Sequence, residues 1–257
     1  MTAALRPLAV LAGLVCGWQV LVSITALPPY ILPGPARVAT AWAAHWPLIL
    51  DNAALTLAEI ALGLALGTAL GCASALAMAA FRPARRWLLP VLVVSQAVPV
   101  FALAPLLVLW LGYGIASKVA MATLIIYFPV TAAFHDGLRR TDPGWIDLAR
   151  TMDAGRWALL RRVRIPAALP ALASGLRVAT AVAPIGAVVG EWVGASAGLG
   201  YLMLHANARM QVDLMFAALA TLAVMAVALY FTVDGLLRRA LPWQPDTSPT
   251  DERRGMP

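Results

Sequence analysis

Charged residues are scarce in this sequence: Asp, Glu, Lys and Arg make up 12% of its 257 residues, whereas 61% are hydrophobic. Soluble domains carry about 25% charge, so this chain has too few polar side chains to cover a water-exposed surface. A transmembrane helix needs ~20 mostly apolar residues, and the sequence contains several such runs. The composition therefore excludes an ordinary soluble domain and predicts a membrane protein.

Lysine and cysteine are almost absent as well. Lys118 is the one lysine, and no Gly-x-x-x-x-Gly-Lys-Ser/Thr sequence occurs, so the chain lacks the loop that cradles nucleotide phosphates. Cys16 and Cys72 lie inside apolar runs and have neither the spacing of a metal site nor that of a disulfide framework. We therefore expect this chain to bind no metal and no cofactor.

Six apolar runs predict an all-α, polytopic membrane protein with six transmembrane helices. The predicted spans are residues 8–27, 53–80, 88–110, 119–134, 168–193 and 214–237. Residues 38–50 are expected to form a separate short helix at the membrane interface. In the second span Gly63, Gly67 and Gly71 recur every four residues, a spacing that lets helices approach closely.

The arginines cluster between the apolar runs, which is a signal of membrane topology. With the N-terminus inside, 15 of the 19 Lys and Arg residues fall in cytoplasmic segments, and only Arg37, Lys118 and Arg209 fall outside. This split predicts a multi-pass inner-membrane protein with both termini in the cytoplasm, and it explains the net charge of +7 without a nucleic acid partner. Residues 1–243 are expected to form the membrane domain, and residues 244–257 a disordered cytoplasmic tail.

The longest polar stretch, residues 136–166, separates the fourth and fifth predicted spans. Asp142 followed by Pro143 is a typical helix start, because the side chain caps the first N–H groups and proline suits the first turn. Apolar residues at helical spacing follow, and then a second helical stretch rich in arginine. We expect a short helical hairpin on the cytoplasmic face, held near the anionic leaflet by its charge, with Pro166 and Pro170 breaking the path back into the membrane.

This loop resembles the coupling motif of binding-protein-dependent ABC importer permeases, which reads Glu-Ala-Ala, three residues, Gly, nine residues, Ile, any residue, Leu-Pro. The matching positions are Asp147, Leu148 and Ala149 for the first three places, Asp153 for the Gly place, and Val163, Ile165 and Pro166 for the end. Asp153 departs from Gly, but Asp tolerates left-handed backbone geometry better than most residues. Gly155, which follows Ala154, is expected to share the turn. The resemblance implies that these residues contact an ATPase.

Three further segments, residues 99–118, 166–179 and 186–203, are similar to the nitrate, sulfonate, taurine and pyrimidine branch of that family. The resemblance implies a fold like that of type I ABC importers and a permease subunit, not an enzyme, that moves a small polar solute from periplasm to cytoplasm. It implies a cytoplasmic ATP-binding subunit carrying ATP and Mg, a periplasmic substrate-binding protein, a second permease copy in a homodimer, and membrane lipid. Residues 95–114 look most like permeases for a thiamine-precursor pyrimidine; sulfonate, taurine and nitrate are the alternatives.

Polar residues inside apolar spans are candidates for a gate or a transport pathway. We expect Glu191 either at the outer mouth of the pathway or in a salt bridge that fixes helix packing. Arg177 is a further pathway candidate, although its place near the cytoplasmic end of the fifth span favours a structural pair, and Glu59 is one guess for its partner. Gln96 and Pro99 are candidates for lining the pathway, and an interhelical hydrogen bond is the alternative for Gln96.

An ion-coupled secondary transporter is the alternative function, although the sequence shows no convincing inverted repeat of the kind such proteins often have. An intramembrane enzyme is a third class. The spans contain no His-x-x-x-His, no Gly-x-Ser-x-Gly and no facing pair of aspartates, so the sequence assigns no catalytic residue.

Overall fold

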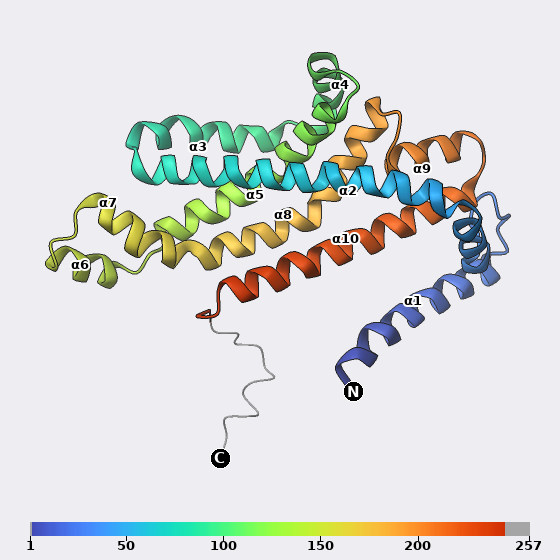
Figure 1. Ribbon diagram of the computed structural model, residues 1–257, viewed down its shortest axis with the longest axis horizontal. Coiled ribbons are helices and arrows are strands. Elements are labelled where there is room, and N and C mark those ends of the chain that lie inside the picture. Colours follow the sequence, from blue (N-terminus) through green and yellow to red (C-terminus); the bar gives the residue numbers. More distant parts are fainter. Residues whose placement is uncertain (1, 245–257) are drawn as a thin grey trace. The chain divides into compact units, whose positions relative to one another are not determined.

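The computed structural model describes residues 2–244, and every regular element in that range is a helix (Figure 1). In chain order these are α1 (Thr2–Thr25), α2 (Pro35–Ala80), α3 (Arg82–Ala97), α4 (Val100–Leu111), α5 (Ile115–Arg139), α6 (Pro143–Thr151), α7 (Arg156–Leu159), a π-helical turn (Leu160–Arg164), α8 (Ile165–Gly194), α9 (Leu199–Ala208) and α10 (Val212–Ala240). The predicted all-α class is confirmed.

The chain divides into two compact units, each built from three separate stretches. The first unit comprises the residues up to Ala65, Pro99–Leu124 and Ala183–Val227; the second comprises Leu66–Val98, Ile125–Val182 and the residues from Ala228 onward. The first unit therefore contains α4 and α9, and the second contains α3, α6 and α7. Helices α2, α5, α8 and α10 contribute residues to both units.

Four helical segments are long and apolar enough to cross a membrane: α2, α5, the continuous stretch Arg156–Gly194, and α10. Helices α3 and α4 add a fifth crossing if the two are one broken span, and Ala9–Thr25 of α1 is a shorter apolar helix. Large apolar side chains such as Val224 and Phe231 are exposed on these helices, as a surface facing lipid requires. The number of six spans stays a prediction.

Two helix boundaries differ from those predicted. Residues 38–50 lie within α2, which consists of two helical stretches that meet in a kink at His45 (φ −121°, ψ 19°), so the separate helix predicted there ends at the kink and not at residue 50. Pro47, two residues after the kink, removes one helical hydrogen bond there. The predicted third span is broken: α3 ends at Ala97, Val98 is extended, and Pro99 is the N-cap of α4. The residue before a proline disfavours helical geometry, which accounts for this break.

The predicted break at Pro166 and Pro170 is wrong. Helix α8 begins at Ile165, immediately after the π-helical turn Leu160–Arg164, and runs through both prolines. The N–H of Ile165 bonds to the carbonyl of Leu160, five residues earlier. This wider turn makes room for the proline ring, so the chain re-enters a long helix without a loop.

Small residues let α5 pack directly against α2 in each unit. In the first unit, a Cβ atom added to Gly63 would lie 2.5 Å from the Cβ of Ala122. In the second unit, a Cβ added to Gly71 would lie 2.9 Å from Cγ1 of Val130. The predicted close approach at the glycines of α2 is confirmed at these two positions.

Candidate functional site

Helix α6 begins where the sequence predicts. Asp142 is its N-cap, and the Oδ1 atom of this residue accepts a hydrogen bond of 2.7 Å from the N–H of Gly144. Pro143 is the first helical residue, where its missing N–H costs nothing. The helix is thus started by its own local sequence.

A tight turn joins α6 to α7, and Asp153 makes it possible. Asp153 has a φ of +59°, the left-handed conformation that its position in the motif predicts. The N–H of Ala154 donates to the carbonyl of Ala149 across the turn at 3.0 Å. Gly155 is extended (φ −61°, ψ 162°) and caps α7. The left-handed residue of this turn is therefore Asp153 and not Gly155.

One face of α6 and its C-cap carry large apolar side chains that the rest of the described chain leaves more than half exposed. Trp145, Leu148 and Met152 are 57%, 62% and 76% exposed, and their spacing of three and four residues places them on one side of the helix. On this short helix Asp147 pairs with Arg150 at 3.2 Å, and both side chains are exposed. Exposed apolar patches of this kind mark contact surfaces for other molecules.

Four of the motif residues line one groove. Leu148, Ala149, Val163 and Pro166 border an open, mainly apolar groove of about 610 Å³ in the second unit. The same groove is lined by Trp145, by Met152 and by Trp243, which lies beyond the end of α10. Ile165 packs against the core cluster of that unit that is formed by residues such as Phe134, Leu138 and Leu160. The structure therefore brings together the two ends of the sequence motif.

Two arginines tie the hairpin to the ends of other helices. The guanidinium of Arg156 donates to the carbonyl of Ala80, the last residue of α2. Arg164 donates to the carbonyl of Leu138, in the last turn of α5, through Nε at 3.0 Å and Nη2 at 2.7 Å. The last carbonyls of a helix lack helical partners, so a guanidinium stabilises them. In the sequence, both arginines are recognisable only as topology signals.

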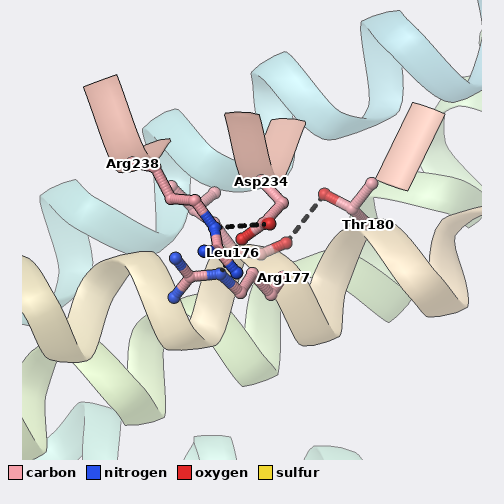
Figure 2. Close-up of polar contacts among 5 residues, drawn as sticks. All are labelled: Leu176, Arg177, Thr180, Asp234 and Arg238. Atoms are coloured by element: carbon pink, nitrogen blue, oxygen red, sulfur yellow. Dashed lines mark hydrogen bonds and ion pairs between the residues drawn. The ribbon is translucent and has the colours of Figure 1, made fainter. Parts of the chain in front are cut away.

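Arg177 forms the structural pair predicted for it, but with a different partner. Its Nε donates to Oδ1 of Asp234 at 2.6 Å, and Oδ2 of the same carboxylate accepts from Nε of Arg238 at 2.9 Å (Figure 2). One carboxylate on α10 is thus held by two guanidiniums, one from α8 and one from the next turn of α10. The guess that Glu59 pairs with Arg177 is wrong.

Glu191 is buried and holds another part of the chain in place. The hydroxyl of Thr56 on α2 donates to its Oε1 at 2.6 Å, and the backbone N–H of Gly200 donates to its Oε2. Its partners are hydrogen-bond donors and not a salt-bridge cation. Of the two roles considered for Glu191, these contacts belong to the packing role.

The N-terminus of α9 is capped entirely by side chains from other helices. Gly198, Leu199 and Gly200 supply three consecutive N–H groups, which are left without helical partners. Gly198 donates to Oδ1 of Asn52 at 2.6 Å, and Leu199 donates to Oγ1 of Thr56 at 2.8 Å. Glu191 takes the third, and its charge favours the positive end of the helix dipole. These glycines, which look like an exposed connector, are buried.

A buried lysine closes the other side of this cluster. Nζ of Lys118 donates to the carbonyl of Gly114 at 3.0 Å, to that of Gly194 at 2.6 Å, and to that of Tyr113. Gly194 is the last residue of α8, so Lys118 caps that helix. Glu59 is also buried here and interacts with the Glu191 carboxyl and the Lys118 ammonium. This role of Lys118 was not predicted, although a lone lysine next to an apolar run is a signal of function or packing.

The two remaining pathway candidates do not join this cluster by any described contact. Pro99 is the N-cap of α4. Gln96 lies in α3, but its side chain is outside the described residues. Both stay predictions.

Comparison with known proteins identifies the class. Residues 63–243 match the family of binding-protein-dependent transport system inner membrane components. The match covers more than half of the chain, so this protein belongs to that family. It is the permease subunit of a binding-protein-dependent ABC importer, and it is a multi-pass protein of the inner membrane.

Relatives with assigned transport roles cover nearly the whole chain. This chain is 57% identical over 235 residues to a probable ABC transporter permease protein of Haemophilus influenzae. The aligned residues cover 91% of this chain and 96% of that protein. A riboflavin transport system permease protein of Chloroflexus aurantiacus is 42% identical over 87% of this chain and 84% of its own length. A formylaminopyrimidine transport permease protein of Halalkalibacterium halodurans is 36% identical over 84% of this chain and 87% of its own length.

The fold is that of type I ABC importer permeases. An inward-facing conformation of the MetNI methionine ABC transporter superimposes with a TM-score of 0.66 over 76% of this chain and 97% of that chain, at 18% sequence identity. With the family match, this likeness disfavours the ion-coupled secondary transporter and the intramembrane enzyme.

Proposed function

We propose that the hairpin of α6, the Asp153 turn and α7 is the element through which a separate ATPase subunit drives this permease. The observation that carries the proposal is the exposed apolar face of Trp145, Leu148 and Met152 on a helix that belongs to an otherwise polar loop. Because the chain has no phosphate-binding loop of its own, ATP and Mg bind on the partner subunit.

The contacts of the hairpin suggest how force is transmitted. Helix α7 continues through the π-helical turn into α8 without a loop. Arg156 holds the end of α2, and Arg164 holds the last turn of α5. A displacement of α6 by the ATPase therefore moves the ends of three membrane helices together. Nucleotide binding and hydrolysis then shift a two-state equilibrium between inward-facing and outward-facing pathways.

The proposal extends to the assembly. Two copies of this chain form the pathway in the lipid bilayer, a periplasmic binding protein delivers the solute, and both termini lie in the cytoplasm. The clustered arginines between Arg82 and Arg164 belong to the second unit together with α6, whereas Arg37, Lys118 and Arg209 belong to the first. This grouping supports a cytoplasmic position for α6, since positive charge concentrates in cytoplasmic segments.

The proposed solute is a thiamine-precursor pyrimidine. It is supported by the 36% identity to a permease named for formylaminopyrimidine transport. The 42% identical relative is named for riboflavin, which is also a planar nitrogen heterocycle. Relatives named for taurine and aliphatic sulfonates are 28% identical, and these solutes, with nitrate, are the alternatives. Calorimetric titration of the associated periplasmic protein with formylaminopyrimidine, riboflavin and taurine tests the choice; tight binding of taurine alone would refute it.

Two substitutions at Asp153 test the coupling role. Because Asp153 has a positive φ, Asp153→Gly is expected to keep the turn, and Asp153→Val to break it, since a β-branched residue is strongly disfavoured there. Copurification of the ATPase and transport-coupled ATP hydrolysis are measured for both variants. Loss in the valine variant with retention in the glycine variant supports the proposal. Unchanged coupling in both would refute the role of the hairpin.

A further inference from the structure

Two buried carboxyl groups of the first unit lie within hydrogen-bonding reach of each other. They belong to Glu59 of α2 and Glu191 of α8, and each residue is 1% exposed. Both lie in helical segments that are long and apolar enough to cross a membrane. Two ionised carboxylates this close repel each other, and a buried ion without a partner is costly. The pair therefore needs either enough positive charge or a proton.

The cation that faces this pair cannot balance both carboxylates. In the described chain Lys118 of α5 is the one cation that acts on Glu59, and it acts on Glu191 too. An ammonium group has three N–H donors, and those of Lys118 go to the backbone carbonyls of Tyr113, Gly114 and Gly194. With both carboxyls ionised, the site would hold one surplus negative charge and no free ammonium donor.

The hydrogen bonds indicate which carboxyl carries the proton. Glu191 accepts from the hydroxyl of Thr56 at 2.6 Å and from the N–H of Gly200, and such donors stabilise an anion. In contrast, Oε2 of Glu59 has no hydrogen-bond partner among the described residues. A proton on Glu59 supplies a further donor for Glu191 and leaves one carboxylate opposite one ammonium. The site is then electrically neutral.

The same carboxyl pair lies where α9 is attached to the rest of the unit. The N–H of Gly200, in the first turn of α9, bonds to Glu191. The backbone of Gly198 approaches the Glu191 carboxyl so closely that no Cβ atom fits between them. Loss of the proton would place two like charges directly beneath this attachment, and their repulsion would weaken it.

We propose that Glu59 and Glu191 together bind one proton, carried by Glu59 and donated to Glu191, and that this proton locks the start of α9 to α2 and α8. The pair has Lys118 as its charged neighbour. Its other contacts, Thr56 of α2 and the N–H groups of Gly200 and Tyr201, are neutral. The function goes beyond coupling to an ATPase, because it makes the attachment of α9 sensitive to pH.

The direction of the pH effect follows from proton counting. Glutamates of an unfolded chain are ionised above about pH 5, whereas the folded pair keeps one proton. The folded state then binds one proton more than the unfolded state, so its stability falls as the pH rises. The expected fall in the folding equilibrium constant is about tenfold per pH unit, for as long as the folded pair keeps its proton.

The test uses the complete chain in detergent micelles and two variants. Glu59→Gln keeps the shape of the side chain and an N–H donor but cannot titrate. Asp51→Asn is the matched control, because it removes an exposed carboxyl from the same helix. At pH 7 we expect the infrared carbonyl stretch of a protonated carboxyl in the parent and in Asp51→Asn, and its loss in Glu59→Gln. Between about pH 6 and pH 8 the folding constant of the parent should fall relative to that of Glu59→Gln by about tenfold per unit.

Four results would overturn the proton site. One is the absence of a protonated-carboxyl band in the parent at pH 7, in H2O and in D2O; this measurement needs no variant, so it decides the matter even where Glu59→Gln does not fold. Another is a band that persists in Glu59→Gln. The third is the same pH dependence of stability in the parent and in Glu59→Gln. The fourth is stabilisation of the parent by Na⁺ at constant ionic strength that Glu59→Gln loses, since a metal cation and not a proton would then balance the charge.

Discussion

Replacing Thr56 by valine tests whether the buried cluster around Glu191 holds the first unit together. Valine keeps the shape of threonine but removes Oγ1, which donates to Glu191 at 2.6 Å and accepts from the N–H of Leu199 at 2.8 Å. Interhelical hydrogen bonds in membranes average about 0.6 kcal/mol and reach about 1.7. A bond to a carboxylate and an orphaned buried N–H both lie at the upper end, so the two losses together predict about 2–3 kcal/mol.

Thr180→Val is the matched control. Thr180 is also buried, but its hydroxyl bonds only to the carbonyl of Leu176 in its own helix, at 2.7 Å (Figure 2). That carbonyl keeps its helical partner, so the expected cost is below about 0.5 kcal/mol. Unfolding is followed by circular dichroism in mixed micelles of increasing dodecyl sulfate content. Equal free energies of unfolding for the two variants would refute the reasoning that the Glu191 network stabilises this unit.

The remaining predictions concern packing and charge in the second unit, and the same unfolding assay measures them. Gly175→Ala should lower the free energy of unfolding by about 1–3 kcal/mol, because the new Cβ would lie 2.8 Å from the carbonyl oxygen of Pro129. Gly235→Ala has nothing within 4 Å of the new Cβ and should stabilise α10 by up to about 1 kcal/mol. A less stable Gly235→Ala than Gly175→Ala would contradict the packing. Asp234→Leu leaves the guanidinium of Arg177 without its carboxylate and should destabilise the protein by about 2–3 kcal/mol. The double variant with Arg177→Leu should recover part of that loss, and no recovery would argue against the pair.

Features set by neighbouring residues were predictable from the sequence. The start of α6 follows from Asp142 and Pro143, which cap the helix and fix its first φ angle without help from the rest of the chain. The positive φ of Asp153 follows from its position in the motif. Close packing at Gly63 and Gly71 follows from the spacing of small residues.

Features set by distant residues were not predictable in this way. Glu191 depends on Thr56, which is 135 residues away, and one sequence gives no sign of which helices are neighbours. The partner of Arg177 has to lie at a similar depth in the membrane. This residue lies in the first half of α8 and Asp234 in the last turns of α10, both in the second unit, whereas Glu59 belongs to the first.

The wrong prediction of a helix break at Pro166 and Pro170 has a separate cause. Pro166 and Pro170 are strong breakers in local terms. The sequence carries no evident sign of the π-helical turn at Leu160–Arg164, which leads into the helix that contains them. At Pro99 the same residue type does end a helix, because Val98 is free to become extended. Helices α3, α4 and α5 also run through Pro90, Pro105 and Pro129, so a proline alone does not show where a helix ends.

The central claim is that α6 lies on the cytoplasmic side as the contact for an ATPase. Labelling its C-cap residue, Met152, tests this claim most directly. Met152→Cys is introduced after Cys16 and Cys72 are replaced by serine, and the protein is treated with a membrane-impermeant maleimide in spheroplasts and in inside-out vesicles. Because Met152 is 76% exposed, we predict rapid labelling in inside-out vesicles, protection there when the ATPase subunit is added, and no labelling in spheroplasts. Labelling from outside in intact spheroplasts would contradict the account.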